Sequence, residues 1–129
     1  MTTVGGIAGG DGKSYACLVA PFPPSTNNLF VNRSRGRFPS DAYKAWRAEA
    51  DIAFIQQKPL TEFYDKTEIT LSFGRPDRRK HDLDNLAKAI LDHLVSWGVI
   101  NDDSLIEKLT LQWAPDVTGC RIEIESIAA

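Results

Sequence analysis

The chain has 129 residues, a formal net charge of −2, 43% hydrophobic residues and 25% charged residues, which are the proportions of an ordinary soluble globular protein. Its length is typical of one domain with its own core, and no apolar run approaches the length of a membrane span. The N-terminus lacks a basic segment followed by an apolar one, so we expect a cytoplasmic protein with no membrane partner. The charge balance excludes a protein coated in positive charge but leaves local basic patches open.

Residues 1–13 are rich in glycine and show no apolar periodicity, which predicts a flexible tail in front of a single domain over residues 14–129. Gly12-Lys13-Ser14 resembles the end of a phosphate-binding loop. However, Ile7 stands where that motif has a glycine, and a strand pattern follows where the motif needs a helix. We therefore reject a phosphate-binding loop.

The first half of the domain predicts a strand, a loop and a helix. Residues 14–20 are apolar and β-prone, and the proline-rich residues 21–28 must form an extended loop because proline cannot join a strand ladder. Ser40 can cap a helix over residues 41–57, which Pro59 stops. The apolar side chains expected to pack this helix on a sheet are Ala42, Ala45, Trp46, Ala53 and Phe54.

The second half predicts three strands and one helix. Residues 66–74 alternate between apolar and polar, as in a half-buried strand, and residues 84–97 carry an apolar helical face that ends at Gly98. Strands over 106–113 and 120–127 are separated by turn residues, which predicts a hairpin. The order β-α-β-α-β-β indicates an α+β domain with one mixed β-sheet and helices packed on it.

The two cysteines, Cys17 and Cys120, are far apart in the sequence. Neither belongs to a CxxC motif or lies near a histidine pair. They therefore predict buried free thiols and not a disulfide framework or a zinc site.

Asp82 and Asp84 flank Leu83 just before the second helix. If the backbone is extended there, the two carboxylates share one side and Leu83 faces the core. Hard divalent cations such as Mg²⁺ take oxygen ligands of this kind, and the stretch Asn101-Asp102-Asp103-Ser104 offers a third acid further along. Taken singly, each aspartate is more often a helix cap or a turn former, but together they predict a metal-dependent phosphodiesterase.

Lys88 lies four residues after Asp84, so the two side chains are expected to meet on one flank of the helix. As an exposed ion pair this contact would add little stability. The functional alternative is that Lys88 holds a metal-binding carboxylate or faces the phosphate under attack. His81 could act as a general base, but a lone histidine in a polar loop is more often only solvated.

Two basic segments accompany the acids. One has three arginines spaced by two, which can point to one side of an extended segment as a positive arm, and the other directly precedes Asp82. Such runs are usually solvated loops, but beside an acidic cluster they can attract a phosphate backbone. The residues predicted to contact DNA are Arg33, Arg35, Arg37, Arg75, Arg78, Arg79 and Lys80.

These elements together resemble the RusA-type Holliday junction endodeoxyribonucleases of bacteria and their phages. The resemblance covers roughly residues 15–127 and leaves the N-terminal tail unexplained. The stretches that carry it are Pro23-Pro24-Ser25 with Asn27, Asp82-Leu83-Asp84-Asn85 with Lys88, and Gly98-Val99-Ile100 followed by Asp102-Asp103.

The resemblance implies a homodimer that uses Mg²⁺, with Mn²⁺ as the alternative ion. It implies resolution of four-way DNA junctions by paired symmetric nicks in DNA recombination and repair. It also implies that Asp82, Asp84 and Asp103 bind the metal, and that these acids and Lys88 are the catalytic residues.

Three other interpretations compete with this one. Phosphatases of the haloacid-dehalogenase type also use D-x-D, but their first aspartate ends an apolar strand, whereas a basic run precedes Asp82. An EF-hand needs a spaced series of oxygen ligands ending in glutamate, but the chain after Asp82 turns helical. A non-catalytic DNA-binding or phage structural module with the same fold remains open, although the presence of all three acids speaks against it.

Overall fold

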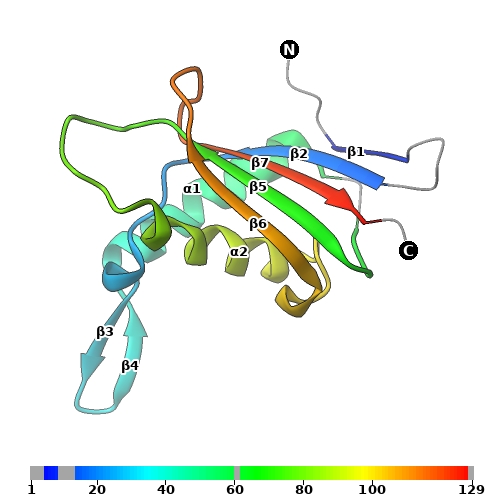
Figure 1. Ribbon diagram of the computed structural model, residues 1–129. Coiled ribbons are helices and arrows are strands. Elements are labelled where there is room, and N and C mark those ends of the chain that lie inside the picture. The colour runs from blue at the N-terminus through cyan, green and yellow to red at the C-terminus, as the bar shows by residue number, and fades with distance from the viewer. Residues whose placement is uncertain (1–4, 9–13, 60–61, 128–129) are drawn as a thin grey trace.

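The computed structural model describes residues 5–8, 14–59 and 62–127. A five-stranded sheet forms its body, in the order β1-β2-β7-β5-β6 (Figure 1). β5 and β6 run parallel to each other, and the other neighbours pair antiparallel. The strands are β1 (Gly5–Ala8), β2 (Ser14–Ala20), β5 (Thr67–Phe73), β6 (Ile106–Trp113) and β7 (Cys120–Ser126). The predicted α+β fold with a mixed sheet is confirmed.

Helices α1 (Asp41–Gln57) and α2 (Ala87–Ser96) both lie along one face of the sheet (Figure 1). The apolar side of each central strand faces them, because alternate residues of a strand point to opposite faces. The opposite face of the sheet carries ion pairs such as Lys108–Glu68 and Arg121–Glu123. The fully buried side chains of the predicted β5 face are Thr67, Ile69, Leu71 and Phe73.

The N-terminal cap of α1 is confirmed, since the Ser40 side chain accepts a hydrogen bond from the backbone N–H of Tyr43 at 3.1 Å. The predicted apolar face is only partly correct. Ala42 and Ala45 are exposed, because alanine has too little apolar area to decide which side of a helix is buried. Large aromatic side chains decide it instead. The buried residues of α1 are Tyr43, Trp46, Ala50 and Phe54.

The predicted hairpin between β6 and β7 is wrong, because β5 lies between these two strands. The crossover from β5 through α2 places β6 beside β5, and β7 then pairs with the opposite edge of β5. The connecting loop crosses over the end of β5, where the Gly74 N–H donates to the Gly119 carbonyl at 2.9 Å. A Cβ atom on Gly74 would lie 1.7 Å from the Val117 carbonyl oxygen, so this crossing needs a glycine.

A second, two-stranded sheet was not expected. β3 (Phe30–Arg33) and β4 (Gly36–Pro39) form a hairpin that projects from the body below the helices in Figure 1. These strands are short and polar, so they lack the apolar alternation that identifies a strand in a sequence. The turn at residues 34–35 places Arg33 and Arg37 on opposite faces, so the expectation that the three arginines share one side is wrong.

Most of the predicted tail lies outside the described residues, but Gly5–Ala8 forms β1 and pairs with β2. This pairing uses only backbone groups, and glycine-rich sequences give no side-chain signal for it. Cys17 and Cys120 are buried free thiols, as predicted, and burial raises the pKa of both. Among the described residues, no helix is long and apolar enough to cross a membrane.

Candidate active site

A cavity of about 650 Å³ opens between the proline-rich loop and the basic loop that follows β5. The Thr26 hydroxyl donates to the Asn85 carbonyl at 3.0 Å, which ties the proline-rich loop to the turn before α2. Asp82 is in the wall of this cavity, together with Arg79 and Lys80. The complete lining is Phe22, Pro23, Pro24, Ser25, Asn27, Asn28, Pro76, Asp77, Arg79, Lys80, His81, Asp82, Asn85 and Leu86.

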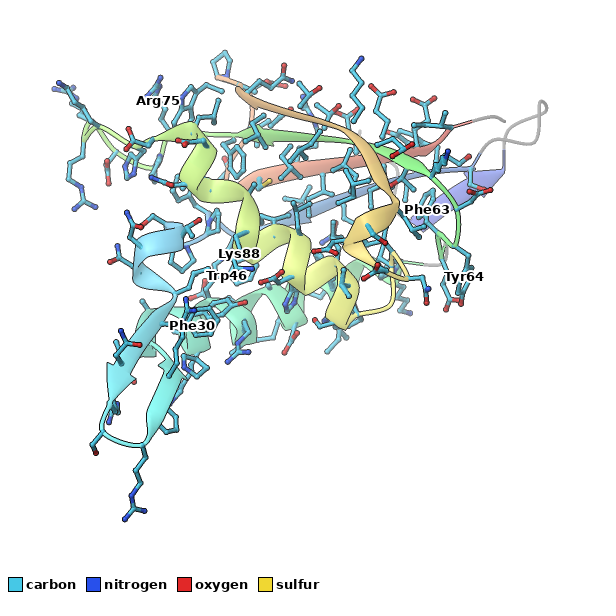
Figure 2. All side chains as sticks on the ribbon, turned by 60° about the horizontal axis from the view of Figure 1, so that its bottom comes forward. Phe30, Trp46, Phe63, Tyr64, Arg75 and Lys88 are labelled. Carbon is cyan, nitrogen blue, oxygen red and sulfur yellow. The ribbon has the colours of Figure 1, made fainter. Side chains whose placement is uncertain are left out.

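An aromatic cluster supports both loops at the ends of β5 and β6. Phe22 stacks on Trp113 at 6.4 Å between ring centroids and meets the edge of Phe73 at 6.2 Å. His81 packs against Phe22 at 5.5 Å, and the Arg75 guanidinium lies 4.1 Å from the centre of the Trp113 ring. The cluster therefore fixes the two walls of the cavity relative to the sheet, and Figure 2 shows Arg75 at this end of the molecule.

Asp77 organises the basic loop. Arg79 donates to its carboxylate at 3.0 Å, and Nε2 of His81 lies 2.9 Å from the same group. These two contacts hold the pKa of Asp77 well below its usual range. His81 is therefore not freely solvated, in contrast to the sequence-based interpretation, and Asp77 was missed because an acid inside a basic run looks like a spacer.

The basic loop leaves three of its cations without an internal ion pair. Among the ion pairs of the described residues, none involves Arg75, Arg78 or Lys80, and all three residues are exposed. Arg79, in contrast, is already paired with Asp77. Arg75 lies against the Trp113 ring, so Arg78 and Lys80 offer the positive charge of this loop that has neither an ion pair nor an aromatic contact.

Asp82 and Asp84 stand at the start of α2, on either side of Leu83. Asp82 has extended backbone angles (φ −85°, ψ 115°) and begins a 3₁₀ turn, η2 (Leu83–Leu86), that leads into α2 at Ala87. Both aspartates are exposed, and Leu83 packs against the core as predicted. Asp82 lines the cavity, whereas Asp84 does not.

Lys88 contacts Asp92 and not Asp84. Its Nζ atom lies 3.1 Å from the Asp92 carboxylate, one helical turn further along α2. The predicted Asp84–Lys88 pair fails because Asp84 belongs to the 3₁₀ turn, in which the i, i+4 spacing of an α-helix does not hold. Asp92 was missed because its position on the half-buried flank of the helix carries no motif.

Asp103 lies at the other end of α2. It begins the short turn η3 (Asp103–Leu105), which leads directly into the first residue of β6. Figure 1 shows this yellow-orange turn at the end of α2 remote from the green turn that holds Asp84. α2 has ten residues and is therefore about 15 Å long. The fold thus keeps Asp82 and Asp84 together in sequence but separates them from Asp103.

The described part of one chain accordingly does not assemble a metal-binding set. Among the described residues, no three or more histidine, cysteine, aspartate or glutamate side chains are grouped so that they could hold a metal ion. The three acids that the resemblance assigns to Mg²⁺ cannot bind one ion within a single chain, because α2 separates Asp82 and Asp84 from Asp103.

The fold and the cavity define an α+β protein whose candidate site combines exposed carboxylates with a basic loop. Residues 21–125 match the model of the endodeoxyribonuclease RusA family. The chain is 31% identical over 108 residues to the crossover junction endodeoxyribonuclease rusA of Enterobacteria phage HK97, covering 84% of this chain and 90% of that protein. It is 32% identical over 110 residues to crossover junction endodeoxyribonucleases of Escherichia coli K12 and Enterobacteria phage 82, covering 83% and 89%. The chain belongs to the RusA family.

Proposed function

We propose that this protein is an endodeoxyribonuclease that resolves four-way DNA junctions by paired symmetric nicks in DNA recombination and repair. Family membership supports the substrate class. The observation that carries the proposal is the position of Asp82 in a cavity wall that also contains Arg79 and Lys80. A carboxylate can hold a divalent cation, and the neighbouring Arg and Lys groups can attract the phosphate backbone, so the two together suit hydrolysis of a phosphodiester. The protein would act in the cytoplasm of a bacterial or phage-infected cell.

The active unit that we propose is a homodimer with acids from both chains in each site. Asp82 and Asp84 of one chain would lie next to Asp103 of the partner chain. Such a set would supply the carboxylate oxygens that Mg²⁺ prefers, and Mn²⁺ accepts the same ligands. The separation of the acids along α2 supports this arrangement. Within one chain, Asp82 and Asp84 lie before α2 and Asp103 lies after it, so the length of the helix keeps them apart.

A two-fold axis across the middle of α2 would produce this pairing. An isologous contact exchanges the two ends of the helix, so that the start of one copy meets the end of the other. The outward flank of α2 carries the half-buried Leu91 and Val95 beside the Lys88–Asp92 pair. Apolar residues of this kind can bury further area against a second copy.

The first test is cleavage of a labelled four-way junction with and without Mg²⁺. The proposal predicts paired nicks at symmetric positions that depend on the metal. Asp82→Asn, Asp84→Asn and Asp103→Asn should each abolish cleavage and preserve junction binding, because each removes a ligand charge but none of the basic surface. A variant that cuts at the wild-type rate would remove that residue from the site.

The second test uses mixed dimers of Asp84→Asn and Asp103→Asn chains. If each site combines both chains, one site of the mixed dimer carries both substitutions and the other carries neither. Mixing two inactive proteins should then restore single nicks. If each site lies within one chain, every site keeps one substitution and the mixture stays inactive. Recovery of nicking therefore separates a shared site from a site within one chain.

A non-catalytic DNA-binding or phage structural module is the second candidate function. It is favoured by one observation, namely that a single chain does not gather the three acids among its described residues. This alternative predicts junction binding that neither Mg²⁺ nor Mn²⁺ converts into cleavage. The junction assay therefore decides between an enzyme and a binding protein.

A further inference from the structure

The β3–β4 hairpin is firmly attached at its base. Leu29, directly before it, is fully buried, and the Ser40 N–H, directly after it, donates to the Leu29 carbonyl at 2.8 Å. Phe30 meets the edge of the Tyr43 ring on α1 at 5.6 Å between centroids. The hairpin is therefore held by α1 at one end while its strands project from the body (Figure 1).

The two faces of the hairpin differ in chemistry. Residues paired directly across two antiparallel strands share a face, so Phe30, Asn32, Arg37 and Pro39 lie on one side. On that side the Phe30 ring is covered, since the Arg37 guanidinium lies over it at 4.3 Å from the ring centre. The other face presents the cross-strand pair Val31 and Phe38.

Val31 and Phe38 are exposed although both are large and apolar. Val31 is 37% exposed and Phe38 is 41% exposed, and they lie opposite each other near the middle of the projecting ribbon. An isolated two-stranded ribbon is only marginally stable in water, and burial of this apolar pair on its surface would be favourable. This face can therefore bury further apolar area against a binding partner.

The charges around this face favour a polyanionic partner. Arg33 shares the face with Val31 and Phe38, and Arg35 lies in the turn at the tip. No acidic residue occurs between the proline-rich loop and Asp41, so nothing within this segment compensates the arginines. Apolar side chains flanked by arginines are the combination with which proteins separate stacked bases and hold the adjoining phosphates.

We propose that the β3–β4 hairpin enters the branch point of the DNA, where Phe38, supported by Val31, stacks on a base and Arg33 and Arg35 contact the flanking phosphates. The inference rests on the proposed function, since it assumes a four-way junction as substrate. At a branch point each arm ends in a base pair that can lose its stacking neighbour. Inserting a ring there costs less than in continuous duplex, where a base step must first be unstacked. The hairpin would thus select junctions over linear DNA.

The test measures binding without divalent metal, so that cleavage does not interfere. The probes are a four-way junction with 2-aminopurine beside the branch point and a linear duplex with the same label. Phe38→Ala should weaken junction binding about 5- to 150-fold, the range for one base–aromatic stack, and change duplex binding little. The fluorescence rise that wild-type protein causes at the branch point should disappear with this variant.

Tyr64→Ala is the matched control, because Tyr64 is also an exposed aromatic residue, at 68%. Figure 2 shows Tyr64 on the far side of the molecule from Phe30 at the hairpin base. This control should behave as wild type. Phe38→Trp should restore junction preference and fluorescence, whereas Phe38→Leu should not, since it keeps apolar volume but loses the flat ring. Nearly unchanged duplex binding by Phe38→Ala would show that its loss of junction binding is not a folding defect.

The outcomes separate this inference from the function on which it rests. If wild type cuts junctions but Phe38→Ala keeps the full junction preference, the insertion of Phe38 at the branch point is overturned and the nuclease function stands. If Phe38→Ala instead turns a dimer into a monomer in sedimentation, the apolar face binds a second copy, and the insertion of Phe38 is likewise overturned. If wild type neither prefers nor cuts junctions, the proposed function itself has failed.

Discussion

The Nζ atom of Lys88 lies 3.1 Å from Oδ2 of Asp92, one helical turn further along α2. Both side chains are about half exposed, so the pair contributes only about 0.3–0.5 kcal/mol to the free energy of unfolding. Lys88 can therefore exchange Asp92 for a phosphate group at little energetic cost.

The first prediction follows from this exchange. Lys88→Ala should slow single-turnover cleavage of a bound junction by about 100-fold or more, the effect of removing one charge-stabilising group, while junction affinity changes little. Asp92→Asn is the matched control, because it removes the partner and keeps the lysine, and it should cut at nearly the wild-type rate. A loss of affinity alone in Lys88→Ala would contradict a role in the chemical step.

The second prediction concerns the basic loop. Reversing the charges of Arg78, Arg79 and Lys80 together should weaken binding to all DNA forms. It should also reduce the slope of log K against log salt by about 0.9 for each phosphate that the loop no longer neutralises. Titrations between low and moderate salt measure this slope. Lys66→Glu with Lys108→Glu is the control, since both lysines already pair with glutamates elsewhere on the sheet. An unchanged salt slope would show that these three residues do not neutralise DNA phosphates.

The third prediction compares two glycines. Gly74→Ala should lower the free energy of unfolding by about 2–4 kcal/mol, because its Cβ would lie 1.7 Å from the Val117 carbonyl and the crossing loop must move. Gly98→Ala meets no atom within 4 Å and has only its positive φ of 76° to strain, so about 1–2 kcal/mol is expected. Chemical denaturation measures both, and equal losses would argue against the steric account.

The fourth prediction concerns His93, which is 4% exposed and lies among Trp46, Phe54 and Trp97. Its Nε2 atom is 3.0 Å from Oδ1 of Asp51 but is not aligned for a hydrogen bond. That oxygen instead accepts from Nε1 of Trp97 at 2.8 Å. Burial lowers the pKa of His93, and Asp51 opposes this only in part.

The folded protein therefore binds this proton less readily than the unfolded chain does. The stability linked to His93 is present above the unfolded pKa of about 6.5 and is lost as pH falls below it. Denaturation between about pH 7.5 and 5.5 should show this loss for wild type and a weaker dependence for His93→Leu. An equal pH slope in His93→Leu would assign the effect to other groups.

Local sequence signals predicted most elements because they depend on neighbours in the chain. Ser40 caps α1 through the N–H three residues later, and Gly98 takes the positive φ that ends the second helix. The alternation of β5 was likewise confirmed in the burial of Ile69 and Leu71. These features are decided within a few residues, so periodicity and capping rules reach them.

The sequence by itself determined the class of fold, the identity of the acids, the lysine and the cations that form the candidate site, and the family resemblance. Only the tertiary structure decided how these groups are arranged. Strand order places β5 between β6 and β7, and a rigid helix of ten residues separates Asp84 from Asp103. Distances between residues that are far apart in the chain depend on how whole elements pack, and no local pattern encodes them.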